Sequence, residues 1–217
     1  MTIEGPDRII ECPNCNGLLS HITFLSWNSL GARQWTDSKL DGPMFVPLDS
    51  IGRCPHCRHY LWLEDATIVG EYMWNDKNVP LEWKQCPKIV WLKNSDGYSG
   101  AVQQKVFGTS GKREEYLRMH LWWEINDLIR HENEEDMETF QERLEEFADN
   151  LHALIPLLDM TDRRGQLLHA EIFRELGDFE KCLALLADFP NRDDPVRCLL
   201  RDLAQEKNRR VQELKWD

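Results

Sequence analysis

The spacing of apolar positions changes along the chain, and it predicts strands first and helices later. Short apolar runs at residues 22–27 and 60–63 are bounded by Gly, Pro and Asn, which is typical of strands. Residues 31–38 predict a further strand followed by a turn. From residue 111 onward the apolar period becomes helical. The pattern therefore predicts a β region followed by a helical region.

Two long apolar stripes define the start of the helical region. The first falls on one helical face and comprises Leu117, Leu121, Ile125, Leu128 and Ile129. The second is a seam spaced by three and four residues, and it comprises Phe140, Leu144, Phe147, Leu151, Leu154 and Leu158. Pro156 lies within this seam, so we expect the helix to kink or end there.

Three further helices are predicted by their terminal signals. A helix over residues 167–176 is expected to end at Gly177, and residues 179–187 read as its antiparallel return. Asp194 followed by Pro195 is typical of an N-cap and first helical position, so a last helix is expected from there to about Leu214.

The stretch between the two regions is less regular. Residues 79–83 and 89–92 look strand-like, whereas residues 94–100 and 108–111 read as loops from their Gly, Ser, Asn and Asp content. We therefore predict an α+β fold with a small zinc-ribbon β domain at 1–70, a connector with short strands and loops at 71–110, and an antiparallel helical domain at 111–217.

Charge is unevenly distributed over the 217 residues. The formal net charge is −12, of which residues 1–70 contribute −3, residues 71–110 +1 and residues 111–217 −10. Non-specific affinity for nucleic acid comes from Lys and Arg that neutralise phosphates, so a chain this acidic makes nucleic acid an unlikely partner. A partner protein with a basic surface fits the charge better.

The N-terminal segment and the cysteines indicate the compartment. Residues 1–11 contain no apolar run and three acidic residues, which does not match a secretory signal, and no apolar stretch approaches the length of a membrane span. Four of the seven cysteines form two Cys-Pro-x-Cys pairs. That arrangement fits metal binding in a reducing compartment better than disulfides, so we expect a cytoplasmic protein.

The strongest chemical motif is the pair Cys12-Pro-Asn-Cys15 and Cys54-Pro-His-Cys57. Two residues between paired cysteines let one tight turn direct both sulfurs to one ion, and four thiolates complete the tetrahedron that Zn²⁺ prefers. A filled tetrahedron leaves no position for substrate water, so we expect one structural Zn²⁺ per chain. Iron–sulfur ligation and a redox pair are the alternatives. Gly17 fits a turn that needs a positive φ.

Two resemblances extend this interpretation. The cysteine pattern resembles a zinc ribbon, and together with residues 31–37, Trp122-Trp123 and Asn126-Asp127 the chain is similar to uncharacterised bacterial proteins with an N-terminal zinc ribbon and a C-terminal helical half. Residues 170–186 resemble one tetratricopeptide unit, with Cys182 where that family usually has Ala. These resemblances imply a tetratricopeptide-like helical architecture and no particular activity.

Other candidate residues have both a functional and a structural interpretation. His56 and His59 could ligate metal or lie on the surface; Cys86 could be a reactive thiol; Cys182 and Cys198 are expected to be buried apolar groups. Trp35-Thr36-Asp37 could be a contact motif or pack over the zinc-ribbon sheet, and Trp122 and Trp123 could line a pocket or the core. The acidic run 132–138 could bind a divalent cation or cap a helix.

The functional prediction is a non-catalytic protein-interaction module held by structural zinc. The motifs of phosphate loops, nucleophile elbows and zinc peptidases do not occur in the chain. One alternative is an immunity or inhibitor protein that blocks a basic toxin. Another is an enzyme with an unrecognised site in the helical half. A third is nucleic-acid binding through Arg33, Lys39, Arg53 and Arg58.

Overall fold

The computed structural model describes residues 2–43, 49–130 and 142–215. The chain divides into two compact units. Met1–Ala32 and Gly42–Lys93 form the N-terminal unit, and Arg33–Asp41 and Asn94–Asp217 form the helical unit. A short segment of the N-terminal sequence, Arg33–Asp41, thus belongs to the unit built by the second half of the chain.

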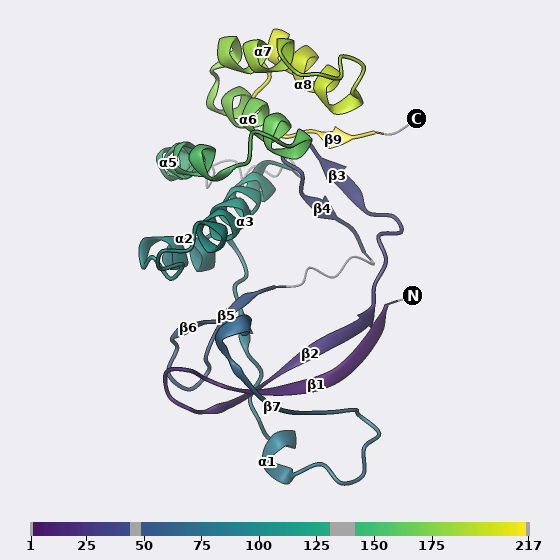
Figure 1. The fold of residues 1–217 in the computed structure, drawn as a ribbon, viewed down its shortest axis with the longest axis vertical. Coiled ribbons are helices and arrows are strands. Elements are labelled where there is room, and N and C mark those ends of the chain that lie inside the picture. Colours follow the sequence, from purple (N-terminus) through teal and green to yellow (C-terminus); the bar gives the residue numbers. More distant parts are fainter. Residues whose placement is uncertain (1, 44–48, 131–141, 216–217) are drawn as a thin grey trace. The chain divides into compact units, whose positions relative to one another are not determined.

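The N-terminal unit contains two three-stranded antiparallel sheets (Figure 1). In the first, β1 (Ile3–Glu11) lies between β2 (Leu18–Ser26) and β7 (Thr67–Tyr72). In the second, β5 (Ile51–Arg53) lies between β6 (Tyr60–Trp62) and β8 (Val90–Trp91). A 3₁₀ turn at Leu63–Asp65 and a short helix α1 (Leu81–Lys84) complete the unit. The strands expected around residues 22–27 and 60–63 are present.

A small core joins these strands to the cysteine pairs. It is a cluster of fully or almost fully buried residues, namely Ile10, Cys12, Leu19, Cys54, Leu61 and Ile89. Two of the four paired cysteines are therefore core residues as well as candidate ligands. An apolar core this small stabilises a unit only weakly without a further cross-link.

The helical unit is built around α3 and a helical hairpin. Its helices are α2 (Ser95–Gln103), α3 (Gly111–Arg130), α5 (Leu144–Leu154), α6 (Arg163–Leu176), α7 (Phe179–Ala187) and α8 (Pro195–Gln205), with a 3₁₀ turn at Ile155–Leu157. A small sheet in the order β4 (Leu40–Asp41), β3 (Arg33–Trp35), β9 (Glu213–Leu214) joins the inserted segment to the C-terminal strand. α3 packs against α2 and α5, and α6 against α7 and α8.

The helix ends follow from the sequence signals. Gly177 ends α6 with a left-handed φ of 86°, and Asp178 starts α7 by accepting a hydrogen bond from the Lys181 N–H. Asp194 caps α8 in the same way, with Pro195 at the first helical position. Pro156 lies in the 3₁₀ turn that follows α5. The predicted hairpin, the predicted cap and the predicted end of the seam at Pro156 are thus confirmed.

Three predictions about local structure are wrong. Residues 81–84 form helix α1, not a strand, because Trp83 packs over Gly70 of β7, where a Cβ would lie 2.0 Å from its ring. Residues 95–103 form helix α2, not a loop, because the Asn94 side chain caps it and Tyr98 and Ala101 are buried. The last helix ends at Gln205, and Glu213–Leu214 pairs with β3.

The fold class is α+β, as predicted: an antiparallel β region with four clustered cysteines precedes a helical region. The predicted limits of the zinc-ribbon domain (1–70), the connector (71–110) and the helical domain (111–217) remain a prediction. In the described part of the chain, no helix combines the length and apolar character needed to span a membrane.

Gly165 near the start of α6 provides a first test of packing. A Cβ at this position would lie 1.7 Å from the carbonyl oxygen of Asp159, so Gly165→Ala is expected to destabilise the helical unit by about 1–3 kcal/mol. Gly111→Ala at the start of α3 is the matched control, because its Cβ would meet no atom within 4 Å, and it is expected to be neutral or stabilising. Thermal denaturation followed by circular dichroism at 222 nm measures both; equal stability of the two variants would contradict this packing.

Candidate metal centre

The two cysteine pairs lie in turns with the same backbone structure. In the first, the Cys12 N–H donates to the Gly17 carbonyl at 3.0 Å and the Asn16 N–H donates to the Cys12 carbonyl at 2.9 Å. In the second, the Cys54 N–H donates to the His59 carbonyl at 2.9 Å and the Arg58 N–H donates to the Cys54 carbonyl at 2.8 Å. Asn16 and Arg58, each directly after a second cysteine, both have a φ of 58°. The repeated sequence Cys-Pro-x-Cys therefore produces two matching knuckles.

The knuckles bring four sulfurs together. Cys12 Sγ lies 3.9 Å from Cys57 Sγ, and Cys15 Sγ lies 3.8 Å from Cys54 Sγ. All four sulfurs lie within 4.8 Å of one another. Cys12 and Cys54 are buried, whereas Cys15 is exposed. The group could hold a metal ion, and among residues 2–43, 49–130 and 142–215 no other group of three or more His, Cys, Asp or Glu does so.

Backbone N–H groups and burial set the thiol acidities in opposite directions. The backbone N–H of His59 and the Asn14 side chain, whose Nδ2 lies 3.5 Å from Cys57 Sγ, lower the pKa of Cys57 to about 6. Burial raises the pKa of Cys54 to about 12. A bare Cys54 thiol therefore keeps its proton at neutral pH, and a bound cation is what would make it a thiolate.

His56, which lies between Cys54 and Cys57, and His59, which follows them, are not part of the four-sulfur group that could hold a metal ion. His56 Nε2 lies 3.0 Å from the Leu18 carbonyl, and the His56 ring packs on Gly17, where a Cβ would lie 2.6 Å from it. The backbone carbonyl of His59 accepts the Cys54 N–H. The positive φ expected at Gly17 is found at Asn16 instead, and what Gly17 provides is room for His56.

The remaining cysteines lie apart from this group. Cys182 is fully buried in the core of the α6–α7–α8 hairpin region, as expected for a small apolar residue, whereas Cys198 is half-buried. Cys86 is half-buried, its Sγ lies 3.2 Å from the Glu82 carbonyl, and burial raises its pKa, which makes it less reactive at neutral pH.

Comparisons of the chain with protein-family models, curated proteins and solved structures give no match. The fold and the site themselves define the class: an α+β protein with a four-cysteine group that could hold a metal ion and a helical second half.

The Trp35-Thr36-Asp37 motif is part of the helical unit. Trp35 is 6% exposed and clusters with Ile129 and Val211, and the Arg130 guanidinium lies 4.8 Å from its ring centre. The interpretations of Trp35 as an exposed contact and as packing over the zinc-ribbon sheet are therefore both wrong, whereas Asp37 does cap a turn, because its Oδ1 accepts a hydrogen bond from the Lys39 N–H at 3.0 Å. Next to the β3–β9 pairing, the Thr36 N–H donates to the Gln212 carbonyl at 2.9 Å, and the Gln212 N–H donates to the Thr36 hydroxyl at 3.0 Å.

Asp37 is the centre of a buried polar network that the sequence analysis missed. Its carboxylate is fully buried, forms an ion pair with Arg130, and accepts a hydrogen bond from Asn126 Nδ2 at 2.9 Å. Asn126 also donates to Glu175 at 3.2 Å, and the Trp122 indole donates to Glu175 at 2.7 Å. The pairs Trp122-Trp123 and Asn126-Asp127 are therefore structural: Trp123 donates to the Asp37 carbonyl, and Asp127 pairs with Arg130.

Glu175 is a buried carboxyl group of this network whose pKa is strongly raised. It is 2% exposed, and burial together with the neighbouring Glu171 carboxylate raises its pKa well above the ordinary value, despite the Arg174 guanidinium 4.0 Å away. Arg174 is occupied by a two-pronged ion pair with Glu171, at 2.7 and 2.6 Å. Burial and the Glu171 carboxylate therefore favour the protonated form of Glu175, and they outweigh Arg174 and the Trp122 hydrogen bond, which favour the ionised form.

Glu175→Gln is expected to reduce the pH dependence of stability of the helical unit. Because the folded pKa of Glu175 is raised, its contribution is fully present below the unfolded pKa and is lost as pH rises through the folded pKa. Gln keeps the acceptor oxygen but cannot ionise. Urea denaturation at acid and at alkaline pH should show a smaller decrease in stability for the variant than for the wild type. An unchanged pH slope would contradict the assignment of Glu175.

The cations proposed for nucleic acid are divided between the two units, Arg33 and Lys39 in the helical unit and Arg53 and Arg58 in the N-terminal unit. Arg33 pairs with Asp41, Lys39 with Asp127, and Arg53 donates to Tyr60, so three of the four cations proposed for nucleic acid have protein partners. The acidic run 132–138 lies outside the described residues.

Proposed function

We propose that this protein binds one structural Zn²⁺ through Cys12, Cys15, Cys54 and Cys57 and acts as a non-catalytic protein-interaction module. The supporting observation is the distance between sulfurs in different knuckles. Four sulfurs about 2.3 Å from a zinc ion at tetrahedral angles are about 3.8 Å apart. Two of the four distances between sulfurs of different knuckles, Cys15–Cys54 and Cys12–Cys57, are 3.8 and 3.9 Å, and all four sulfurs lie within 4.8 Å of one another.

The alternatives for this group fit less well. In a four-iron cluster each thiolate ligates a different iron, which requires a wider spacing of the sulfurs than the 4.8 Å found here. A redox pair needs only two cysteines, whereas both knuckles are built alike. Four thiolates fill a tetrahedron, so the ion supports structure and has no open position for a substrate.

An interaction role is also supported by how the polar residues of the helical unit are used. The buried carboxylates Asp37, Glu171 and Glu175 are each engaged by buried donors of the same unit. Exposed acidic side chains, in contrast, occur on α5 and on the α7–α8 connection, among them Glu145, Asp149, Asp188 and Asp193. A partner with a basic surface would complement them.

The test combines metal analysis with affinity capture. Purified full-length protein should contain one zinc per chain by mass spectrometry, and the zinc-loaded protein should capture a partner from cells of its source. The charge-reversing variant Glu145→Lys with Asp149→Lys should weaken capture in a salt-dependent way. The proposal fails if the purified protein contains no metal, or if no protein is captured even at low salt.

A further inference from the structure

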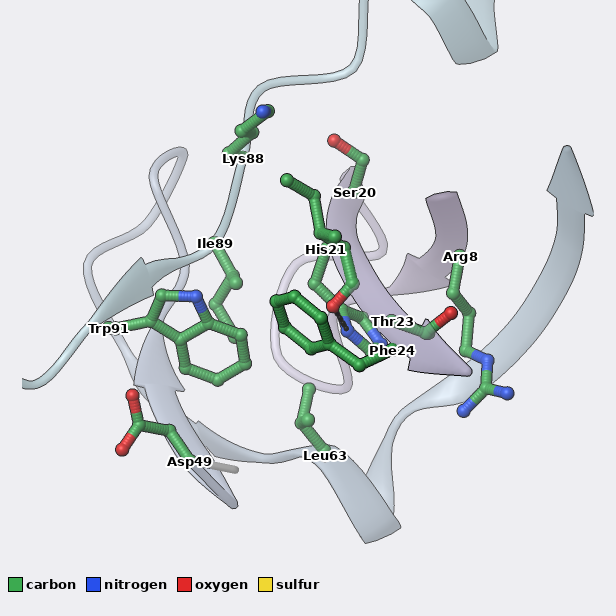
Figure 2. Close-up of a pocket in the computed structure, with 11 residues that line it drawn as sticks. Arg8, Ser20, His21, Thr23, Phe24, Asp49, Leu63, Lys88, Ile89 and Trp91 are labelled. Atoms are coloured by element: carbon green, nitrogen blue, oxygen red, sulfur yellow. Dashed lines mark hydrogen bonds between the residues drawn. The ribbon is translucent and has the colours of Figure 1, made fainter. Parts of the chain in front are cut away.

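An open groove of about 600 Å³ lies in the N-terminal unit, and none of the four sulfurs lines it (Figure 2). Its apolar lining consists of Ile22, Phe24, Leu63, Ile89 and Trp91, and its polar lining includes Arg8, His21, Asp49 and Lys88. Figure 2 shows the Phe24 and Trp91 rings in the middle of this lining, with Leu63 at one end and Lys88 at the other. Volumes of roughly 300–1,000 Å³ are typical of binding sites.

The groove follows the outer edge of β2. Five consecutive residues of this strand, from Ser20 to Phe24, line it. Successive side chains of a strand point to opposite faces of the sheet. Because residues of both faces line the groove, we infer that it lies along the edge of the strand. β2 is an edge strand of its sheet, in the order β2, β1, β7.

The first part of this edge is already paired. The Ser20 N–H donates to the Pro87 carbonyl and the Ile89 N–H donates to the Ser20 carbonyl, both at 3.0 Å. Backbone groups alternate in direction along a strand, so the groups of Ile22 and Phe24 face the same side as those of Ser20. No described strand pairs with them there, and within residues 2–43, 49–130 and 142–215 the Ile22 carbonyl has His21 Nδ1 as its partner, at 3.4 Å.

The groove carries charges of both signs, and Lys88 lies at the end away from the Asp49 carboxylate (Figure 2). Lys88 is exposed and forms no ion pair with the described residues. Arg8 of β1 forms an ion pair with Glu71 of β7, with 2.6 Å between Arg8 Nε and Glu71 Oε1. His21 is buried against Trp91, with ring centres 6.0 Å apart, and burial lowers its pKa, so it is neutral. Lys88 is therefore the cation available to a ligand.

We propose that the groove binds an extended segment of a partner protein, which adds a strand to β2 beside Ile22 and Phe24. One large apolar side chain of the segment packs against Phe24 and Trp91, and an Asp or Glu carboxylate lies beside Lys88. Main-chain hydrogen bonds provide affinity in this mode of recognition, and alternate side chains provide specificity. This inference rests on the proposed interaction function and adds a contact site in the N-terminal unit to the acidic surface of the helical unit.

The probe is a displayed library of short random peptides, selected on zinc-loaded full-length protein. Enriched peptides should carry apolar residues at alternate positions, an acidic residue and no proline within the strand. Synthetic versions are then tested with single amides N-methylated. Alternate amides face the edge, so methylation should weaken binding about tenfold at every second position and have little effect in between.

Lys88→Glu tests the charge. It should weaken binding of acidic peptides about fivefold and favour Lys-containing peptides, while Lys77→Glu, an exposed lysine of the same unit outside the groove, should have no effect. The proposal is overturned by a library that yields no enriched peptide, by N-methylation without an alternating pattern, or by equal effects of the two lysine variants.

Other occupants give distinguishable results. N-acetylphenylalanine that binds as tightly as the peptide would show a small-molecule site, and a concentration-dependent dimer that the peptide dissociates would show pairing with a second copy. Either result overturns the proposal. If a partner is captured equally by wild type and Lys88→Glu, the groove assignment fails while the interaction function stands. If no partner is captured but peptides bind as described, the groove is a peptide-binding site and the proposed interaction function fails.

Discussion

Cys54→Ser is expected to abolish zinc binding and to unfold the N-terminal unit while the helical unit stays folded. Cys54 is both a proposed ligand and a fully buried member of the small core that contains Ile10, Leu19 and Leu61. Structural zinc supplies roughly 10–16 kcal/mol of apparent binding free energy in small domains, which exceeds the stability such a core provides. Hydrogen exchange should show lost protection in β1, β2, β5 and β6 and retained protection in α3 and α6.

The matched control for this variant is Cys86→Ser. Cys86 lies in the same unit but outside the four-sulfur group, so this variant should keep its zinc and its protection. A chelator should reproduce the effect of Cys54→Ser. Zinc affinity should also decrease as pH falls, because protons compete for the thiolates. Full protection in the metal-free protein would contradict a structural role of the metal.

Asp37→Ala is expected to destabilise the helical unit by about 3–5 kcal/mol, because it removes the buried carboxylate partner of the Arg130 guanidinium and leaves it only the partly exposed Asp127. The side chains of Arg130 and Asp37 are 1% and 0% exposed, and Arg130 Nη1 already lacks a hydrogen-bond partner among the described residues. Chemical denaturation followed at 222 nm measures the loss. It should appear in the helical signal even though Asp37 lies in the N-terminal part of the sequence.

Asp41→Ala is the control for this prediction, since Asp41 belongs to the same inserted segment but pairs with Arg33 at the surface, where the two side chains are 42% and 45% exposed. Its cost should be below about 1 kcal/mol. The double variant Asp37→Leu with Arg130→Met should recover most of the stability lost in Asp37→Ala, because an apolar pair can replace a buried ion pair. Equal costs for Asp37→Ala and Asp41→Ala would contradict the network.

Local signals were sufficient for the cysteine knuckles and for several helix ends, although α6 begins at Arg163 and not at the expected residue 167. The spacing of the paired cysteines and the caps at Gly177 and Asp194 each depend on a few adjacent residues, which a sequence displays directly. The α2 helix was missed because its Ser, Asp and Gly content favours loops, whereas the burial of Tyr98 and Ala101 stabilises the helix.

Long-range pairing was beyond the reach of the sequence. β9 pairs with β3 across most of the chain, and Asp37 meets Asn126 and Arg130 about 90 residues later, at separations of 89 and 93 residues. Nothing in the spacing of apolar residues near Trp35 distinguishes packing on one unit from packing on the other. The groove along β2 was missed for the same reason, because it joins β2 to Lys88 and Trp91.

The insertion of Arg33–Asp41 into the helical unit has a consequence for synthesis on the ribosome. The Thr36 hydroxyl accepts a hydrogen bond from the Gln212 N–H, 176 residues further along the chain. Translation at roughly 5–20 residues per second adds that stretch in about 9–35 s. The two cysteine knuckles can therefore come together early, whereas Asp37 meets Asn126 and Arg130 only after about 90 more residues and Thr36 meets Gln212 only near the end of synthesis. Until then the emerging polypeptide presents the edge of β3 that later pairs with β9, an open strand edge that chaperones could recognise.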